Sequence, residues 1–98
     1  MNNRKDQIMK INDGFVLREV AGEQVIMPAG ERISTFDGAV ALNEVSAFIF
    51  STIEANPGIT FEEMVSKITD TYEVDAETAG NDLKNVINDL AGYGIVSE

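Results

Sequence analysis

The sequence contains no cysteine and no histidine among its 98 residues. Without cysteine the chain has no disulfide, no thiolate nucleophile and no zinc–sulfur site, which is consistent with a reducing compartment. Without histidine it lacks the side chain best suited to proton transfer near neutral pH, which is also the commonest metal ligand. These absences argue against most hydrolases and transferases, and we expect no metal site.

Positive charge is also scarce. The chain has 7 Lys and Arg residues against 17 Asp and Glu residues, which gives a formal net charge of -10. Non-specific binding to nucleic acid depends on Lys and Arg side chains that neutralise phosphates. The charge balance therefore argues against a nucleic-acid partner.

Long apolar runs are absent as well, since none approaches the ~20 residues that a membrane-spanning helix requires. Residues 1–10 are polar with a basic tilt and have no apolar segment behind them, so we do not expect a signal peptide here. We expect a flexible N-terminal segment over residues 1–10 and a single domain over residues 11–98. The expected location is the cytoplasm, with no membrane partner.

Carboxylates are abundant, and several of them lie where we expect helices to begin. Glu62 and Glu63 follow Thr60, and Asp75 precedes the next helical pattern. Negative charge is stabilising at a helix N-terminus, whereas a general acid needs a desolvating pocket or a charged partner. Neither a Gly-rich phosphate loop nor a serine in a nucleophile elbow occurs. We therefore predict no catalytic residue, no cofactor and no enzymatic activity.

The first half of the chain has the pattern of β-strands. Residues 15–20 and 24–27 are rich in β-formers and are separated by the turn signal Ala21-Gly22, which predicts a hairpin. Pro28 ends the second run, because proline has no N–H to donate to a strand partner. A polar stretch follows, and residues 39–42 then predict a third short strand.

Three segments in the second half have apolar residues at helical spacing. Asn43 is expected to cap a first helix over about residues 44–55. Thr60 and Glu63 predict a capping box at the start of the second helix. Asp75 is expected to cap a third helix that ends near residue 91.

This element order predicts an α+β fold of the winged-helix type, in which a three-stranded antiparallel N-terminal sheet is followed by a three-helix bundle. Residues 95–96 are expected to add a short strand or to pack as a tail. Gly80 interrupts the third helix at a cost of roughly 1 kcal/mol relative to Ala. We interpret this glycine as a point of close packing against another backbone.

One possible function is DNA binding or transcriptional regulation, because winged helices commonly bind DNA. We keep it as the alternative to the function considered below. The third helix would then read the bases. Its residues 76–91 carry Glu77, Asp82 and Asp89 against Lys84 alone. This acidic helix favours a partner other than DNA.

An ordered set of short segments resembles the PqqD family over about residues 11–97. The first is the Leu-Asn-Glu-x-x-Ala pattern at residues 42–47, which opens the first helix. The others are Phe-Val-Leu-Arg-Glu-Val at 15–20, Thr60-Phe61-Glu62-Glu63, Tyr72-Glu73-Val74-Asp75, Asp82-Leu83, and Leu90 with Gly94-Ile95-Val96. The founding member of the family serves pyrroloquinoline quinone synthesis. Related domains act as recognition elements for ribosomally synthesised, post-translationally modified peptides (RiPPs).

The resemblance implies a peptide chaperone and not an enzyme. Such a domain captures the leader of a precursor peptide and presents the peptide to a modifying enzyme, often a radical SAM maturase. In the family the leader adds as a strand to the third strand, in a groove closed by the third helix. On this sequence the corresponding elements are residues 39–42 and 76–91.

The candidate peptide-binding residues therefore come from one strand and one flank of a helix. They are Ala39, Val40, Ala41, Leu42, Asp82, Asn85, Val86 and Asp89. Helical spacing places Asp82, Val86 and Asp89 together, with Asn85 at their margin. The opposite rim, Lys84 and Asn88, is the competing choice. The oligomeric state stays open, because an edge strand that recruits a peptide can also pair with a second copy.

Overall fold

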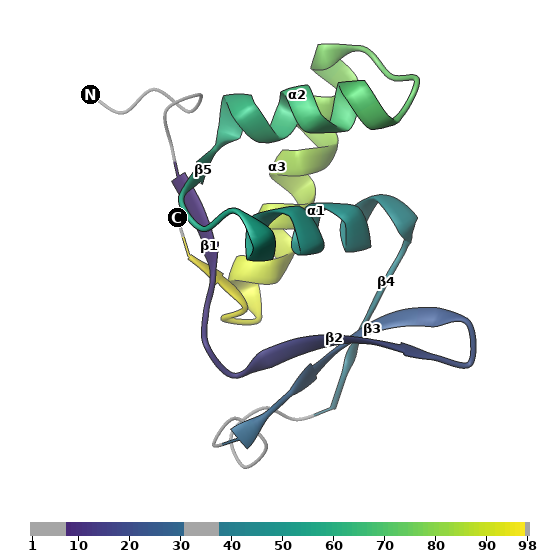
Figure 1. The fold of residues 1–98 in the computed structure, drawn as a ribbon, viewed down its shortest axis with the longest axis vertical. Helices are drawn as coiled ribbons and strands as arrows, with labels where there is room; N and C mark the ends of the chain where they lie inside the picture. Colours follow the sequence, from purple (N-terminus) through teal and green to yellow (C-terminus); the bar gives the residue numbers. More distant parts are fainter. Residues whose placement is uncertain (1–7, 31–37, 98) are drawn as a thin grey trace.

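The computed structural model describes residues 8–30 and 38–97. The described part folds into two small sheets and three helices (Figure 1). In chain order the elements are β1 (Ile8–Ile11), β2 (Phe15–Val20), β3 (Glu23–Pro28), β4 (Val40–Leu42), α1 (Glu44–Ala55), β5 (Ile59–Thr60), α2 (Phe61–Thr71), α3 (Ala76–Gly92) and β6 (Val96–Ser97). Over these ranges no helix combines the length and the apolar character needed to cross a membrane.

The larger sheet has the strand order β2-β3-β4 and is antiparallel throughout. Ala21 and Gly22 join β2 to β3, and their φ angles of 53° and 84° suit the two-residue turns that match the twist of a hairpin. The strand β4 continues almost directly into α1 (Figure 1). The predicted hairpin, the third strand and the α+β fold class are confirmed.

The smaller sheet has the order β5-β1-β6, and its central strand was not predicted. Ile8 to Ile11 form β1, in which Met9 is only 2% exposed. The predicted flexible segment is therefore wrong for residues 8–10, and residues 1–7 lie outside the described part. The sequence pattern gave little indication of this sheet, because the two strands that pair with β1 have only two residues each and are too short to show an alternating pattern. Of the two alternatives for residues 95–96, a short strand or a packed tail, the structure has a strand, β6.

Side chains cap all three helices as expected. The Oδ1 atom of Asn43 accepts a hydrogen bond from the Ser46 N–H at 2.8 Å. The Glu63 N–H donates to the Thr60 hydroxyl at 3.1 Å, and the Thr60 N–H donates to the Glu63 carboxylate at 2.9 Å, which completes the capping box. Asp75 accepts from the N–H of Thr78 at 2.7 Å. These caps set where the helices start.

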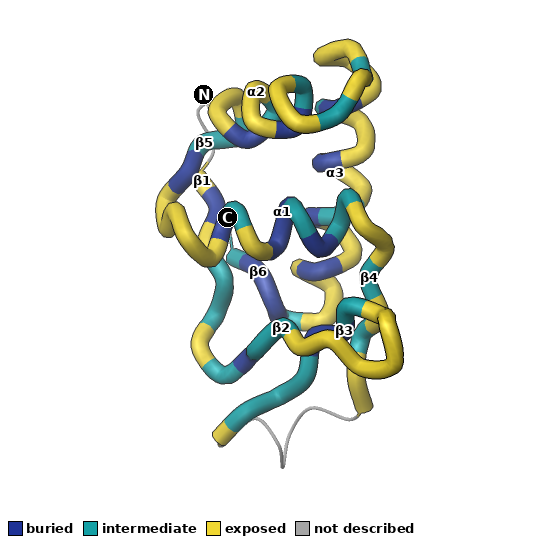
Figure 2. The backbone as a smooth tube through the Cα atoms, turned by 45° about the vertical axis from the view of Figure 1, so that its right-hand side comes forward, coloured by how far each residue is buried: buried dark blue, intermediate teal, exposed yellow. Residues whose placement is uncertain are grey.

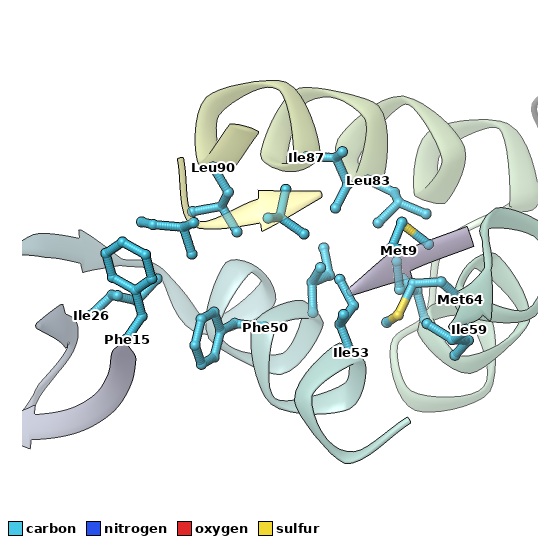
Figure 3. Packing of buried hydrophobic residues seen from close by; sticks show 14 of the residues in the cluster. Met9, Phe15, Ile26, Phe50, Ile53, Ile59, Met64, Leu83, Ile87 and Leu90 are labelled. Carbon is cyan, nitrogen blue, oxygen red and sulfur yellow. The ribbon is translucent and has the colours of Figure 1, made fainter. Parts of the chain in front are cut away.

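One apolar core joins the helices to both sheets. The buried faces of α1, α2 and α3 turn towards the interior, while their outer faces are exposed (Figure 2). Phe50 of α1 is fully buried in this core, and Leu83, Ile87 and Leu90 form the inner stripe of α3 (Figure 3). Met9 of β1 packs in the same cluster, which is why the small sheet belongs to the domain. The core therefore fixes how α3 lies relative to the larger sheet.

The interpretation of Gly80 as a point of close backbone packing is wrong. A Cβ atom added at Gly80 would approach only a ring carbon of Phe61, at 3.9 Å, which is an ordinary van der Waals distance. The position therefore has room for a methyl group. Gly80 is a helical residue without a positive φ angle, so nothing in the backbone requires glycine.

We predict that Gly80→Ala raises the free energy of unfolding by about 0.5–1 kcal/mol, because alanine loses less backbone entropy than glycine on helix formation. Urea unfolding measures the change. Gly94→Ala is the matched control and should destabilise the protein, since Gly94 has a φ angle of 77° that disfavours a side chain. If Gly80→Ala destabilises the protein, the conclusion that nothing at this position requires glycine is wrong.

The capping carboxylates make stability depend on pH. Hydrogen bonds from the backbone and the hydroxyl of Thr60 hold the pKa of Glu63 below its usual value of 4.5. Hydrogen bonds from Thr78 likewise lower the pKa of Asp75 below 3.8. A lowered folded-state pKa stabilises the fold above the unfolded-state pKa, and this stabilisation is lost as the pH falls through the folded-state pKa.

We therefore expect the free energy of unfolding to decrease as the pH falls from about 5 to about 3. The variants Glu63→Gln and Asp75→Asn should each show a shallower decrease than the parent over this range, because each lacks one carboxylate with a lowered pKa. Urea unfolding at several pH values provides the measurement. Parallel pH profiles for the parent and both variants contradict the assignment of this pH dependence to the caps.

Candidate functional site

The outer edge of β4 is the first component of the site. On one side β4 pairs with β3, with Val25 opposite Ala41 and Ile26 opposite Val40. The sheet order ends at β4, so no strand of the described residues pairs with its other side. Such an edge offers backbone N–H and C=O groups to an incoming strand. The edge is short, because β4 contains only three residues.

A groove lies beside this edge, between β4 and the C-terminal half of α3. It is an open cleft of about 610 Å³. Its lining combines apolar, neutral polar and charged side chains from β4, the start of α1 and the end of α3. The lining residues are Val40, Ala41, Leu42, Asn43, Ser46, Val86, Asn88, Asp89, Leu90, Gly92 and Tyr93.

The apolar part of the groove is continuous with the core. Val40 and Leu42 lie on the same face of β4, because side chains two residues apart share a face of a strand. Both are half-buried and pack against the core cluster, as does Val86 of α3. Ala41 is exposed between them. The groove therefore has a partly apolar floor anchored to rigid elements.

The structure brings together only some of the candidate residues predicted from the sequence. Five of the eight line the groove: Val40, Ala41, Leu42, Val86 and Asp89. Ala39 is exposed just before β4 and is not part of the lining. Asp82 and Asn85 are exposed on α3, nearer its N-terminus, and lie outside the groove.

Residues from both of the predicted sides of α3 line the groove. Asn88, from the competing rim, lines the groove beside Asp89 of the favoured flank. Lys84, the other residue of that rim, does not. The groove lies against the last turns of α3. Whether a residue of α3 lines the groove therefore depends on its position along the helix axis as well as on the helical face it occupies.

Besides Asn88, five lining residues are not among the candidates predicted from the sequence, and one of them is Leu90, whose side chain is 1% exposed. Asn43 and Ser46 belong to the start of α1, and Gly92 and Tyr93 belong to the end of α3. Tyr93 is 54% exposed, which is high for a large aromatic side chain. Its spacing of four residues from Asp89 was a usable signal, because residues four apart are neighbours on a helix surface.

A small cluster of side chains holds the junction between β4 and α1. The rings of Phe48 and Tyr72 meet edge to face, with centroids 5.5 Å apart and an interplanar angle of 89°. Burial raises the pKa of Tyr72 above its usual value, and the nearby Glu44 carboxylate and its hydrogen bond raise it further. This contact ties the first turn of α1 to the residue that ends α2. None of these three residues is among those that line the groove.

The groove offers three kinds of interaction to a ligand. The edge of β4 supplies backbone donors and acceptors, the apolar side chains supply contact area, and Asp89 supplies a negative charge. Within the ranges 8–30 and 38–97, no group of three Asp or Glu side chains is placed to hold a metal ion. An extended peptide is a ligand that uses all three kinds of interaction together.

Comparisons with known proteins agree with this geometry. The family model "Coenzyme PQQ synthesis protein D (PqqD)" matches residues 23–96. The chain is similar to the solved structure of TbiB1 in complex with the TbiA(beta) leader peptide, with 27% sequence identity and a TM-score of 0.72. This match covers 90% of the present chain and 94% of the TbiB1 chain. The structure of lasso peptide synthetase B1 complexed with its leader peptide is 16% identical, has a TM-score of 0.71, and covers 92% of this chain and 98% of that chain. Comparison with curated proteins found no match.

The family match extends from the start of β3 to β6. It thus includes the edge strand, all three helices and every residue that lines the groove. The resemblance noted in the sequence is confirmed: the chain belongs to the PqqD family.

Proposed function

We propose that this protein binds the leader segment of a ribosomally made precursor peptide by strand addition along β4. The observation that carries the proposal is the free edge of β4 beside an open groove whose other wall is α3. The family match and the two solved structures of the same fold, each complexed with a leader peptide, support it. The bound peptide would be held for a modifying enzyme.

The energetics of this binding mode are modest. Each backbone hydrogen bond to the edge strand contributes about 0.5–1.5 kcal/mol net. Each apolar leader side chain buried against Val40, Leu42 or Val86 adds roughly 1.5–3 kcal/mol, and ordering a disordered leader removes several kcal/mol. A dissociation constant between ~0.1 and ~10 µM follows from this balance. Such an affinity allows the peptide to be released after modification.

The proposed role is presentation of a peptide, and the chemistry would belong to the partner. Strand addition requires no metal, no cofactor and no catalytic residue of this chain. A modifying enzyme, with a radical SAM maturase as the expected class, is the proposed second partner. The DNA-binding alternative finds no support in the groove, where the one charged residue among the described lining residues is acidic.

Proline substitution in β4 tests strand addition directly. Along an antiparallel strand the N–H groups alternate between the two sides, so only one of Val40 and Ala41 directs its N–H to the free edge. We expect proline at that position to weaken peptide binding at least tenfold while the protein stays folded. Proline at the other position removes a bond to β3 and should lower the free energy of unfolding.

The measurement is fluorescence anisotropy with a leader peptide selected from a displayed library of natural precursor leaders, with urea unfolding of Val40→Pro and Ala41→Pro in parallel. Two folded proline variants that both bind like the parent contradict strand addition at β4.

Charge placed in the groove tests the second wall. Val86→Asp adds a charge beside the apolar floor and should weaken binding by more than 1 kcal/mol. Asn81→Asp adds the same charge at an exposed position of α3 outside the groove and should change the affinity little. Titration of both variants with the selected leader gives the comparison.

Amide chemical shifts on titration should change mainly at residues 40–43 and 86–93, and α2 should stay nearly unchanged. Shift changes confined to the β2–β3 hairpin, or equal losses of affinity in Val86→Asp and Asn81→Asp, rule out this groove as the binding site.

A further inference from the structure

Among the residues that the structure describes, Asp89 is the only charged one that lines the groove. The other lining residues are apolar or neutral, and none of the four described cations, Lys10, Arg18, Lys67 and Lys84, is among them. Asp89 lies one helical turn from both Val86 and Tyr93, which also line the groove. The charge therefore sits on a wall between an aliphatic and an aromatic side chain.

A bound peptide changes the surroundings of this carboxylate. In the free protein Asp89 is exposed, so water solvates its charge. A strand laid along β4 displaces part of that water, and a carboxylate that loses water is destabilised unless a cation or hydrogen-bond donors replace it. A neutral or acidic peptide residue opposite Asp89 is therefore penalised, whereas Lys or Arg there forms a pair that is less screened than one in open solvent.

Position within the groove separates Asp89 from the other acidic residues of α3. Glu77 and Asp82 are exposed and lie outside the groove, so solvent and salt screen their interaction with a peptide on β4. They contribute to the overall charge of -10, which attracts any basic peptide without regard to register. Of the three acidic residues of α3, Asp89 alone lines the groove and so acts at one fixed place along the bound strand.

We propose that Asp89 selects leader peptides carrying Lys or Arg at the one position that faces it. The inference rests on the proposed function and adds a specificity rule to it. Because strand side chains two residues apart share a face, an apolar residue two positions from the basic one should pack on Val86 or Tyr93. The recognised segment would thus carry one basic and one apolar residue on the same side.

The first experiment is selection from a random 12-residue peptide library displayed on phage. The targets are the parent protein, Asp89→Lys, and Glu73→Lys as a control with the same charge change. Glu73 is exposed between α2 and α3 and does not line the groove. We expect the parent and Glu73→Lys to enrich Lys or Arg at one position, and Asp89→Lys to enrich Asp or Glu there.

The second experiment is a double-mutant cycle with the best peptide selected by the parent. Replacing its basic residue by Gln should weaken binding to the parent about fivefold at low salt, the upper range for an exposed ion pair. The same replacement should weaken binding to Asp89→Asn much less, because only the general attraction of the acidic chain is then lost. The amide shifts of the complex show whether the peptide occupies the groove.

Three results overturn the inference. Peptides that shift amides of β4 and α3 but show no basic position contradict the specificity rule and leave the proposed function intact. A basic preference that persists in Asp89→Lys also contradicts the rule and assigns the selectivity to the general acidic charge. Peptides that shift only amides elsewhere, or no selected peptide at all, overturn the proposed function and this inference together.

Discussion

The attachment of β4 is the constraint on which the candidate site depends. This strand must be held firmly on one side while its other side stays unpaired. Three residue pairs join it to β3, and Asn43 then caps α1 immediately after the strand ends. The contact of Tyr72 with Phe48 and Glu44 ties the same junction to the end of α2. The free edge is therefore placed by a helix cap and an aromatic contact as well as by the sheet.

The second wall of the groove depends on the small sheet at the chain ends. Asn12 follows β1, and its Nδ2 donates to the carbonyl oxygen of Gly94 at 2.8 Å. The Ser97 hydroxyl donates to Oδ1 of the same Asn12 side chain at 2.6 Å. These bonds hold the turn that follows Tyr93, so a segment far away in the sequence helps to set where α3 ends. The lining at that end of the groove is thus supported by β1.

The acidic charge of this domain suits a partner other than DNA. The helix that would enter a DNA groove in other winged-helix proteins here forms one wall of a groove beside a free strand edge. Negative charge repels phosphates, but at a single place in a partly apolar groove it provides selectivity for a basic side chain. The same architecture then suits an extended peptide, because backbone hydrogen bonds supply affinity that does not depend on net charge.

The amino-acid sequence alone determined the local elements of this protein. Apolar spacing, the caps at Asn43, Thr60 and Asp75, and the Ala21-Gly22 turn specify the three helices and the hairpin through contacts between residues close in the chain. The free edge of β4 was also predictable, since the resemblance to the PqqD family identifies the third strand.

Only the tertiary structure decided which side chains face one another. The burial of Met9 in β1 depends on partners near residues 59 and 96, and local patterns carry no record of such distant pairing. The place where α3 meets β4 is likewise set by core packing, so the groove includes Asn88 and Tyr93 but not Asp82 or Asn85. Helical periodicity predicts which residues share a face, whereas the height at which two elements touch follows from the packing of the whole core.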